Sequence, residues 1–337
     1  MFSAKRRHAM RDVIIVGAGP VGLACAIEAK RRDLDALVVE KGAVVNSFIG
    51  YPTGLEFFST PELLEIGGHP FSTQRYKPVR EEALDYYRSV ARAEKLDLAL
   101  YEAAERLDGK DGAFQLVTEK SVREAKKVVL ATGFFDVPNP LGAEGEDLGK
   151  VTHYFKEPYP YAGQKVLVVG GANSAAKAAL ACYRHDAEVT MAVLEDDFDD
   201  GLKYWIRPDI ENRIEEGAVA AHFSTGVERV TERSVVLSGP EGRFEIENDF
   251  VLAMTGYRPD YDLFDAFGIA VKDDAARTPA HDADTFETNR AGLYLAGTVA
   301  GGLDTSRWFI ENGREHAQRV FDDIHQKLGQ RAPVAAG

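Results

Sequence analysis

One short pattern occurs twice in this chain and constrains its fold more than any other feature. The first copy covers residues 13–22, with the sequence VIIVGAGPVG, and the second covers 166–175, with the sequence VLVVGGANSA. Each is an apolar run that predicts a buried strand, followed by a glycine turn and an alanine-rich helix. A second apolar run follows each helix, at 36–40 and 188–194. Such strand–helix–strand units form parallel sheets, so the sequence predicts an α/β protein with two Rossmann-like dinucleotide-binding domains.

Later segments indicate that the second of these domains is inserted in the first. Further strands are predicted at 127–133, 250–259 and 292–297, and a helix is predicted at 306–327. The last strand and helix suit a return of the chain to the first domain. We therefore expect residues 10–152 and 283–330 to form one discontinuous domain, 153–282 to form the inserted one, and 1–9 and 331–337 to be flexible.

The first glycine turn has the sequence context of a dinucleotide-binding site. In Gly17-x-Gly19-x-x-Gly22, the first glycine makes a tight turn, the second lets backbone approach a pyrophosphate, and the third lets helix and strand pack closely. The pyrophosphate would lie at the helix N-terminus, where free N–H groups and the helix dipole favour anions. Glu40, at the end of the next strand, can accept hydrogen bonds from an adenosine ribose. Candidate ligands at this turn are Gly17, Gly19, Pro20, Gly22, Glu40 and Lys41.

The second glycine turn departs from this pattern. It has the form Gly170-x-Ala172-x-x-Ala175, and Ala172 places a Cβ where a pyrophosphate would approach the backbone. The next strand leads into an acidic run at 195–200, with the sequence EDDFDD. A carboxylate there suits a ribose 2′-hydroxyl and repels the 2′-phosphate of NADPH. Candidate NAD(P)H ligands are Gly170, Ala172, Asn173, Ser174, Ala175, Glu195 and Gly256.

The acidic run leaves several interpretations open. NADH is the preferred donor and Glu195 binds its ribose, or NADPH binds through bases elsewhere, such as Lys203 or Arg207. Alternatively, the second site is degraded and another donor supplies the electrons. The run is equally compatible with a solvated surface loop that binds nothing.

Charge and cysteine content narrow the class of protein. The formal net charge of −14 argues against nucleic acid or an anionic membrane surface as a partner. No apolar run is long enough for a membrane span. The two cysteines, Cys25 and Cys182, predict neither a disulfide framework nor a Cys-x-x-Cys redox pair, and they favour a reducing cytoplasm. Isolated histidines such as His69 and His153 lack metal-ligand spacing, so no metal site is expected.

The layout of the two turns, with Ala131-Thr-Gly133 ending a strand, resembles the flavoprotein reductases that bind two dinucleotides. In that superfamily the N-terminal motif holds FAD and the inserted motif holds NAD(P)H. More closely, the chain resembles the bacillithiol-disulfide reductases, which are related to thioredoxin reductase but lack its cysteine pair. Five segments carry this resemblance: 44–47, 57–68, 170–175, 203–212 and 309–314.

This resemblance implies FAD, reduction by NADPH, a low-molecular-weight thiol disulfide as substrate, and a homo-oligomer, either a dimer or a tetramer. It adds further FAD ligands to those at the first turn: Asn46, Ser47, Thr132, Gly133, Gly297, Thr298, Phe309 and Ile310. No catalytic residue is assigned, because the flavin itself would carry the electrons.

Three positions depart from the family pattern. Val21 stands where the family often has a cysteine, so thiol chemistry at that position is impossible in this chain. Leu194 lies near the position of the family's arginine after the second strand of the inserted domain, which leaves the choice of donor open. Thr298 replaces the acid that binds the flavin ribityl chain in related reductases, and it hydrogen-bonds less strongly than a carboxylate.

Other functions remain alternatives on the sequence alone. A flavin monooxygenase also has two glycine motifs, but residues 147–157 contain the Gly and His of its fingerprint without the two aromatic residues. A ferredoxin–NAD(P)H reductase is disfavoured because an acidic chain is a poor partner for acidic ferredoxins. An FAD-binding redox sensor with a degraded nucleotide site is the non-enzymatic alternative.

Overall fold

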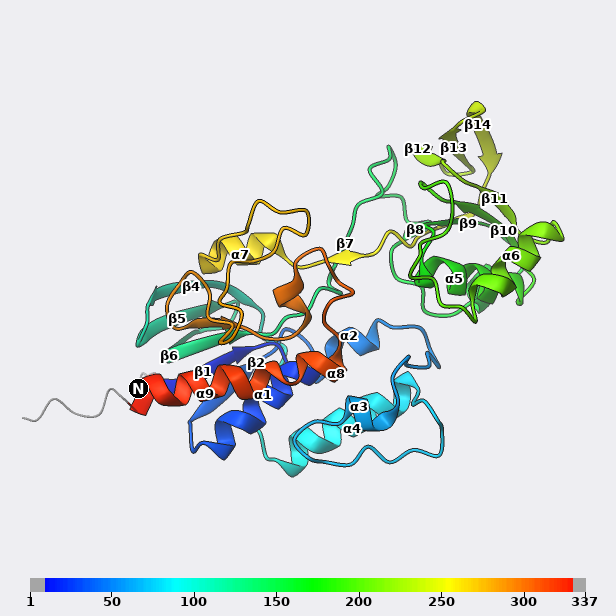
Figure 1. Cartoon of the computed structure of the whole chain (residues 1–337). Helices are drawn as coiled ribbons and strands as arrows, with labels where there is room; N and C mark the ends of the chain where they lie inside the picture. Colours follow the sequence, from blue (N-terminus) through cyan, green and yellow to red (C-terminus); the bar gives the residue numbers. More distant parts are fainter. Residues whose placement is uncertain (1–9, 330–337) are drawn as a thin grey trace, which may run out of the picture. The chain divides into compact units, whose positions relative to one another are not determined.

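The computed structural model describes residues 10–329 (Figure 1). They form two compact units, of which the first contains 10–49, 54–137 and 258–329 and the second contains 50–53 and 138–257. The long insertion therefore begins at 137/138 and ends at 257/258, rather than at the 152/153 and 282/283 expected from the sequence, and the short segment 50–53 also belongs to the second unit. The segments 1–9 and 331–337, expected to be flexible, lie outside the described residues.

Two short elements account for the different junctions. Strand β8 (Val151–Thr152) pairs with β15 (Phe250–Ala253), so β8 belongs to the second unit, which includes residues from 138 onward. Helix α7 (Tyr261–Phe267) contacts β4 (Ala104–Lys110) in the first unit. Elements this short carry no periodic sequence pattern, so the sequence alone does not assign them to a unit.

A seven-stranded sheet forms the centre of the first unit. Its strands lie in the order β3-β2-β1-β6-β5-β4, and β17 also pairs with β6. The strands are β1 (Arg11–Val16), β2 (Ala36–Val39), β3 (Leu98–Ala99), β4, β5 (Ala113–Thr118), β6 (Val122–Leu130) and β17 (Leu293–Leu295). Strand β1 runs parallel to both β2 and β6, and its last four residues are buried. Strands buried on both faces are continuously apolar, which explains the clear sequence signal at 13–16.

Helices complete the first unit. They are α1 (Pro20–Arg31), α2 (Asn46–Ile49), α3 (Pro61–Leu64), α4 (Arg80–Ala93), α7, α8 (Ile310–Gly313) and α9 (His316–Gly329), with a 3₁₀ turn η2 (Thr298–Gly301). Helix α9 packs against α1 through an apolar face that includes Phe321 and Ile324. The single helix predicted at 306–327 is thus two helices, because the chain turns between Gly313 and His316.

The second unit repeats the central arrangement of the first, which confirms the repeat predicted from the sequence. Its main sheet has the order β11-β10-β9-β15-β8, and β9 lies between β10 and β15 as β1 lies between β2 and β6. Helix α5 follows β9 as α1 follows β1. The remaining elements are β9 (Lys165–Val169), α5 (Asn173–Tyr183), β10 (Glu188–Ala192), α6 (Arg207–Glu215), β11 (Ala220–His222) and η1 (Tyr159–Tyr161).

Two smaller sheets are also present among the described residues. In the second unit, β12 (Gly226–Val230), β13 (Ser234–Gly239) and β14 (Gly242–Glu247) form an antiparallel sheet. The two segments that link the units pair with each other as β7 (Val137–Pro138) and β16 (Tyr257–Arg258). None of the helices within residues 10–329 has the length and apolar character needed to span a membrane.

The packing of α9 on α1 can be tested at Phe321, which is fully buried. We expect Phe321→Ala to lower the free energy of unfolding of the first unit by about 3–5 kcal/mol, because it leaves a cavity. The chain has two tryptophans, of which Trp308 lies in the first unit and Trp205 in the second. In a Trp205→Phe background, urea unfolding of the first unit can therefore be followed by the fluorescence of Trp308. Gln318→Ala, at an exposed position of α9, is the control and should not lower the midpoint.

Candidate dinucleotide-binding sites

The first glycine turn, residues 17–22, is closed by backbone contacts that leave no room for two side chains. Gly17 has a φ of +108°, which side-chain-bearing residues rarely adopt, and a Cβ there would lie 2.6 Å from the carbonyl oxygen of Ala131. A Cβ on Gly22 would lie 2.0 Å from the carbonyl oxygen of Gly17. Both glycines are therefore required by the packing of the protein against itself.

Gly19 has a different reason to be glycine. Its φ of −69° and ψ of 175° are accessible to any residue. No described atom beyond its chain neighbours lies within 4 Å of a Cβ built on it. Neither conformation nor packing requires a glycine here, so the missing side chain leaves space at the N-terminus of α1. That space is where a pyrophosphate binds in this motif, and the predicted ligand Pro20 is the first residue of the helix.

Glu40 lies at the carboxyl end of β2, and it is held by two backbone amides. Its Oε2 accepts a hydrogen bond from the Ala18 amide at 2.7 Å, and its Oε1 accepts one from the Gly42 amide at 2.8 Å. Burial raises the pKa of Glu40, while these two hydrogen bonds lower it. The carboxylate is therefore fixed in orientation before any ribose binds, as a ribose ligand should be.

A pocket opens at the carboxyl ends of these strands and brings together five of the predicted FAD ligands. They are Gly17, Glu40, Lys41, Thr132 and Gly133. The pocket exists because β1, β2 and β6 are neighbouring parallel strands whose carboxyl ends lie at one edge of the sheet.

The sequence did not identify several other residues that line this pocket: Ala103, Ala104, Asp136, Val137, Arg258 and Asp260. Asp136 pairs with Lys41 at 2.9 Å, and Asp260 caps α7 by accepting the Leu263 amide. These residues come from loops and linking segments, which have no periodic pattern. The one available signal is that Arg258 and Asp260 lie at the end of the apolar segment that begins at residue 250.

The turn at Gly297 and Thr298 lies beside the pocket. Thr298 Oγ1 lies 3.5 Å from a Cβ built on Gly133, so the two predicted ligands are neighbours. The Gly297 amide donates to Nδ1 of the buried His316 at 3.1 Å. Burial lowers the pKa of His316 to about 3, so the imidazole is neutral and its Nδ1 accepts this hydrogen bond. A Cβ on Gly297 would lie 3.0 Å from Val21, whose side chain therefore packs against this turn.

Four further predicted FAD ligands lie outside the residues that line the pocket. Asn46 and Ser47 begin α2, and the Oδ1 of Asn46 lies 2.1 Å from a Cβ built on Gly42, so Asn46 packs on the loop after Glu40. Phe309 is 47% exposed and Ile310 begins α8. The roles of these four residues as ligands stay predictions.

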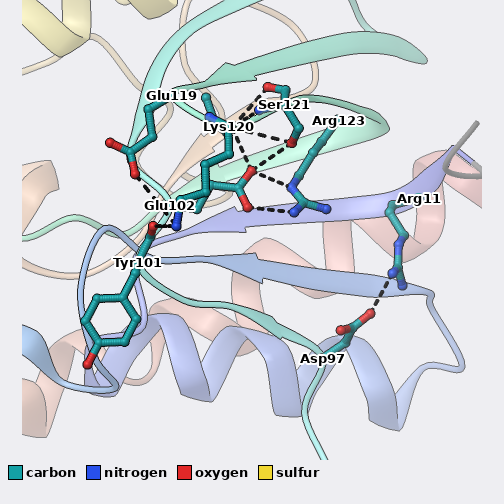
Figure 2. A network of polar contacts seen from close by, with 9 residues as sticks. Arg11, Asp97, Tyr101, Glu102, Glu119, Lys120, Ser121 and Arg123 are labelled. Carbon is teal, nitrogen blue, oxygen red and sulfur yellow. Dashed lines mark hydrogen bonds and ion pairs between the residues drawn. The ribbon is translucent and has the colours of Figure 1, made fainter. Parts of the chain in front are cut away.

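A network of hydrogen bonds and an ion pair lies next to the pocket, and Figure 2 shows the buried carboxylate of Glu102 at its centre. Glu102 Oε1 accepts hydrogen bonds from Thr118 Oγ1 at 2.6 Å and Arg123 Nε at 2.8 Å, and Oε2 accepts one from Arg123 Nη2 at 2.6 Å. The Glu102 amide donates to the Glu40 carbonyl at 2.8 Å. The network therefore connects the hairpin of β5 and β6 to the strand end that carries the ribose acid.

The second glycine turn has the same backbone closure as the first. Gly170 has a φ of +127°, and a Cβ there would lie 2.6 Å from the carbonyl oxygen of Met254. Ala175 is fully buried beneath the turn, whereas Ala172 and Ser174 are exposed at the start of α5. Gly256 has a φ of +80° and lies next to the Asn139 side chain, in the same unit.

Asn173 connects the second turn to the loop that follows β10. Its Nδ2 donates to the Gly201 carbonyl at 3.0 Å, and its Oδ1 accepts the Lys203 amide at 3.0 Å. The Asp199 amide donates to the Gly171 carbonyl at 3.1 Å. The Asn173 side chain thus holds the acidic run beside the turn, which is a structural role that its assignment as a direct ligand did not include.

Comparison with known proteins identifies the family. Residues 14–297 match the model of the pyridine nucleotide-disulphide oxidoreductases. The chain is 40% identical over 316 residues to bacilliredoxin reductase Bdr of Bacillus subtilis (strain 168), an alignment that covers 93% of this chain and 97% of that protein. The solved structure of bacillithiol disulfide reductase Bdr (YpdA) from Bacillus cereus has 38% identity and a TM-score of 0.92, with coverage of 94% of this chain and 99% of that one. The Staphylococcus aureus structure of the same name gives 37% and 0.91, with coverage of 94% and 99%.

The fold and the two glycine turns thus define a flavin-dependent pyridine-nucleotide oxidoreductase, whose cofactors are FAD and NAD(P)H. Within this class, the chain belongs to the bacillithiol disulfide reductase Bdr family. The first turn fits FAD, because Gly19 leaves space at the helix N-terminus and Glu40 is already oriented. Within residues 10–329 there is no group of three or more His, Cys, Asp or Glu side chains that could hold a metal ion.

The space at Gly19 can be tested with a single methyl group. We expect Gly19→Ala to fold with an unchanged melting temperature of the apoprotein, because its Cβ meets no described atom. The affinity for FAD should fall at least about tenfold, because the methyl group enters the space of the pyrophosphate. Titration of the apoprotein with FAD, followed by flavin fluorescence, measures this affinity.

Gly149→Ala is the control, since that glycine is exposed, has no neighbour within 4 Å of a Cβ built on it and lies outside both turns in the sequence. Full FAD affinity in Gly19→Ala would refute the assignment.

The Glu102 network predicts a dependence of stability on pH. The Arg123 guanidinium and the other donors lower the pKa of Glu102 to about 2, from an ordinary value of 4.5. The carboxylate therefore stabilises the fold fully above about pH 4.5 and loses this contribution as the pH falls toward 2.

Melting temperatures of the wild type and of Glu102→Gln, measured from pH 3 to pH 7, test this. We expect the wild-type advantage over Glu102→Gln to be largest near neutral pH and to shrink below pH 4.5. Glu119→Gln, at a half-exposed neighbour, should follow the wild-type curve. A wild-type advantage that does not change with pH would show that the charge of Glu102 is not what stabilises this region.

Proposed function

We propose that this chain reduces the disulfide of a low-molecular-weight thiol of the bacillithiol type. In this reaction NAD(P)H and one proton convert the disulfide into two thiols and leave NAD(P)⁺. Bound FAD would accept a hydride from the nicotinamide and deliver two electrons to the disulfide. The names of the relatives support this class of substrate, since one set is titled bacillithiol disulfide reductase and another bacilliredoxin reductase.

The proposal rests on one observation, the complete burial of the two cysteines. Cys25 and Cys182 are fully buried, and they lie in α1 and α5, which belong to different units. Burial raises the pKa of the Cys25 thiol well above its ordinary value and raises that of Cys182 to about 12. A thiolate is the nucleophile in disulfide exchange, and neither cysteine forms one readily. We infer that the substrate disulfide takes its electrons at the flavin, with no relay through protein thiols.

Removal of both cysteines tests the direct route. We expect the Cys25→Ala/Cys182→Ala variant to reduce bacillithiol disulfide with a kcat within about twofold of the wild type, because neither thiol is exposed. The assay follows NAD(P)H oxidation at 340 nm with the purified holoenzyme and no added redoxin protein. Loss of turnover, with flavin content and flavin reduction unchanged, would contradict the proposal. Activity that appears only after oxidised bacilliredoxin is added would also contradict the proposal, because it would show that the substrate is a protein disulfide rather than a small-molecule disulfide.

We also propose NADH as the preferred electron donor. Leu194 is 71% exposed just after β10, and Glu195 and Asp196 beside it are exposed. At this position in a dinucleotide-binding unit, an acid favours the ribose of NADH, whereas NADPH needs a base. Arg207, one base suggested from the sequence, already donates to the Phe198 carbonyl at 3.0 Å and pairs with the carboxylates of Asp197 and Glu211.

The ratio of kcat/KM for NADH to that for NADPH tests the donor. We expect a ratio above about ten in the wild type, because a carboxylate repels the 2′-phosphate. Leu194→Arg/Glu195→Ser should shift the ratio toward NADPH at least about tenfold by supplying a base and removing the acid. Glu188→Gln, at the opposite end of β10, is the matched control and should leave the ratio unchanged. A wild-type preference for NADPH would refute the choice of donor without affecting the assignment of the disulfide substrate.

We propose that the protein works in the cytoplasm and as a homo-oligomer. Two unpaired cysteines are compatible with a reducing compartment. Large apolar side chains at Ile49, Phe58, Leu63 and Phe309 of the first unit are 41–47% exposed, and an apolar surface of this kind favours association. Light scattering of the purified holoenzyme determines whether it is a dimer or a tetramer.

A further inference from the structure

Arg258 places a side-chain nitrogen that has no hydrogen-bond partner among the described residues at the edge of the FAD pocket. It is the last residue of β16 and lines the pocket together with Gly17, Glu40 and Thr132. Its Nε is buried and has no hydrogen-bond partner among residues 10–329. A buried donor on a charged group is costly to leave unpaired, so such a group indicates a partner that binds there.

The other charged groups of the pocket already have partners. Glu40 accepts two backbone amides, Lys41 pairs with Asp136 at 2.9 Å, and Asp260 accepts the Leu263 amide at 3.0 Å. The charge of Arg258 is therefore not balanced by a hydrogen-bonded carboxylate of the pocket. A negatively charged ligand bound in the pocket would balance the positive charge of Arg258.

The pocket position specifies which part of a dinucleotide carries that charge. Gly17 belongs to the turn that holds a pyrophosphate at the N-terminus of α1, and Glu40 takes the adenosine ribose. A group that lines the same pocket as both faces the adenosine diphosphate half of the cofactor. The only anion in that half is the pyrophosphate, and a guanidinium binds phosphate oxygens through paired hydrogen bonds.

We propose that Arg258 binds the pyrophosphate of FAD and so makes the returning linker part of the cofactor site. Arg258 is the first residue of the first unit after the chain returns from the second, and Val137, the last residue before the chain leaves, lines the same pocket. These two linking segments pair as β7 and β16. Bound FAD therefore holds the linker in place, and loss of FAD releases it.

Binding of fragments to the apoprotein tests the assignment to the pyrophosphate. We expect Arg258→Gln to bind FAD and ADP about 10- to 100-fold more weakly than the wild type, because one charged hydrogen-bonding partner is lost. Its affinity for adenosine, which has no phosphate, should be unchanged. Arg258→Lys should recover part of the affinity, since it keeps the charge but not the planar fork. Arg277→Gln is the matched control, because that guanidinium lies 4.4 Å over the Tyr261 ring and does not line the pocket.

Hydrogen exchange tests the effect on the linker. Addition of FAD to the wild-type apoprotein should slow amide exchange in peptides that contain residues 136–139 and 255–258. In Arg258→Gln saturated with FAD, this protection should be reduced, while protection of the 17–23 turn should remain. Wild-type affinities for FAD and ADP in Arg258→Gln would overturn the proposal. An equal loss of affinity for adenosine would also overturn it, since it would show a role in shaping the pocket rather than in binding phosphate. These binding measurements do not depend on which disulfide is reduced, so they stand or fall separately from the proposed function.

Discussion

The close approach of backbone to backbone at the first glycine turn is the constraint on which the cofactor site depends. The Gly17 Cα meets the Ala131 carbonyl, and the Gly22 Cα meets the Gly17 carbonyl, at distances that exclude a Cβ on either glycine. This contact sets the ends of β1 and β6 beside each other and starts α1 directly over them. Every strand end that lines the pocket is positioned relative to that turn. The tight turn also directs the N-terminus of α1 toward the open space beside Gly19.

The second unit uses the same closure for a different purpose. A Cβ on Gly170 would lie 2.6 Å from the Met254 carbonyl oxygen, the same distance as from a Cβ on Gly17 to the Ala131 carbonyl oxygen, so the closed turn is repeated. The acids differ, because Glu40 is buried and fixed by two amides, whereas Glu195 is exposed on a loop. A buried, fixed ligand suits a cofactor that stays bound, and an exposed one suits a nucleotide that must exchange at each turnover. This difference agrees with the roles predicted for Glu40 at FAD and for Glu195 at NAD(P)H.

The burial of both cysteines supports the proposed transfer of electrons directly from the flavin. Both cysteines are buried within helices, and Val21 packs an apolar side chain against Gly297. The pocket edge is supported by the ion pair of Glu102 with Arg123, and the turn at Gly297 by a hydrogen bond to the neutral His316. In the reaction proposed above, protein groups orient the cofactor and the flavin carries the electrons.

The sequence by itself determined the repeated strand–turn–helix units and the insertion of one in the other, and it picked out Gly17, Glu40 and Gly133, which the structure places in one pocket. These features are local, since a tight turn or a buried parallel strand needs particular residues at fixed spacing. Only the tertiary structure decided the junctions at 137/138 and 257/258, the split of the C-terminal helix, and the presence of Arg258 at the pocket. It also showed that Asn173 holds a loop and that Arg207 is already paired. Such features depend on contacts between residues distant in the chain, and no local pattern records which donors those contacts will satisfy.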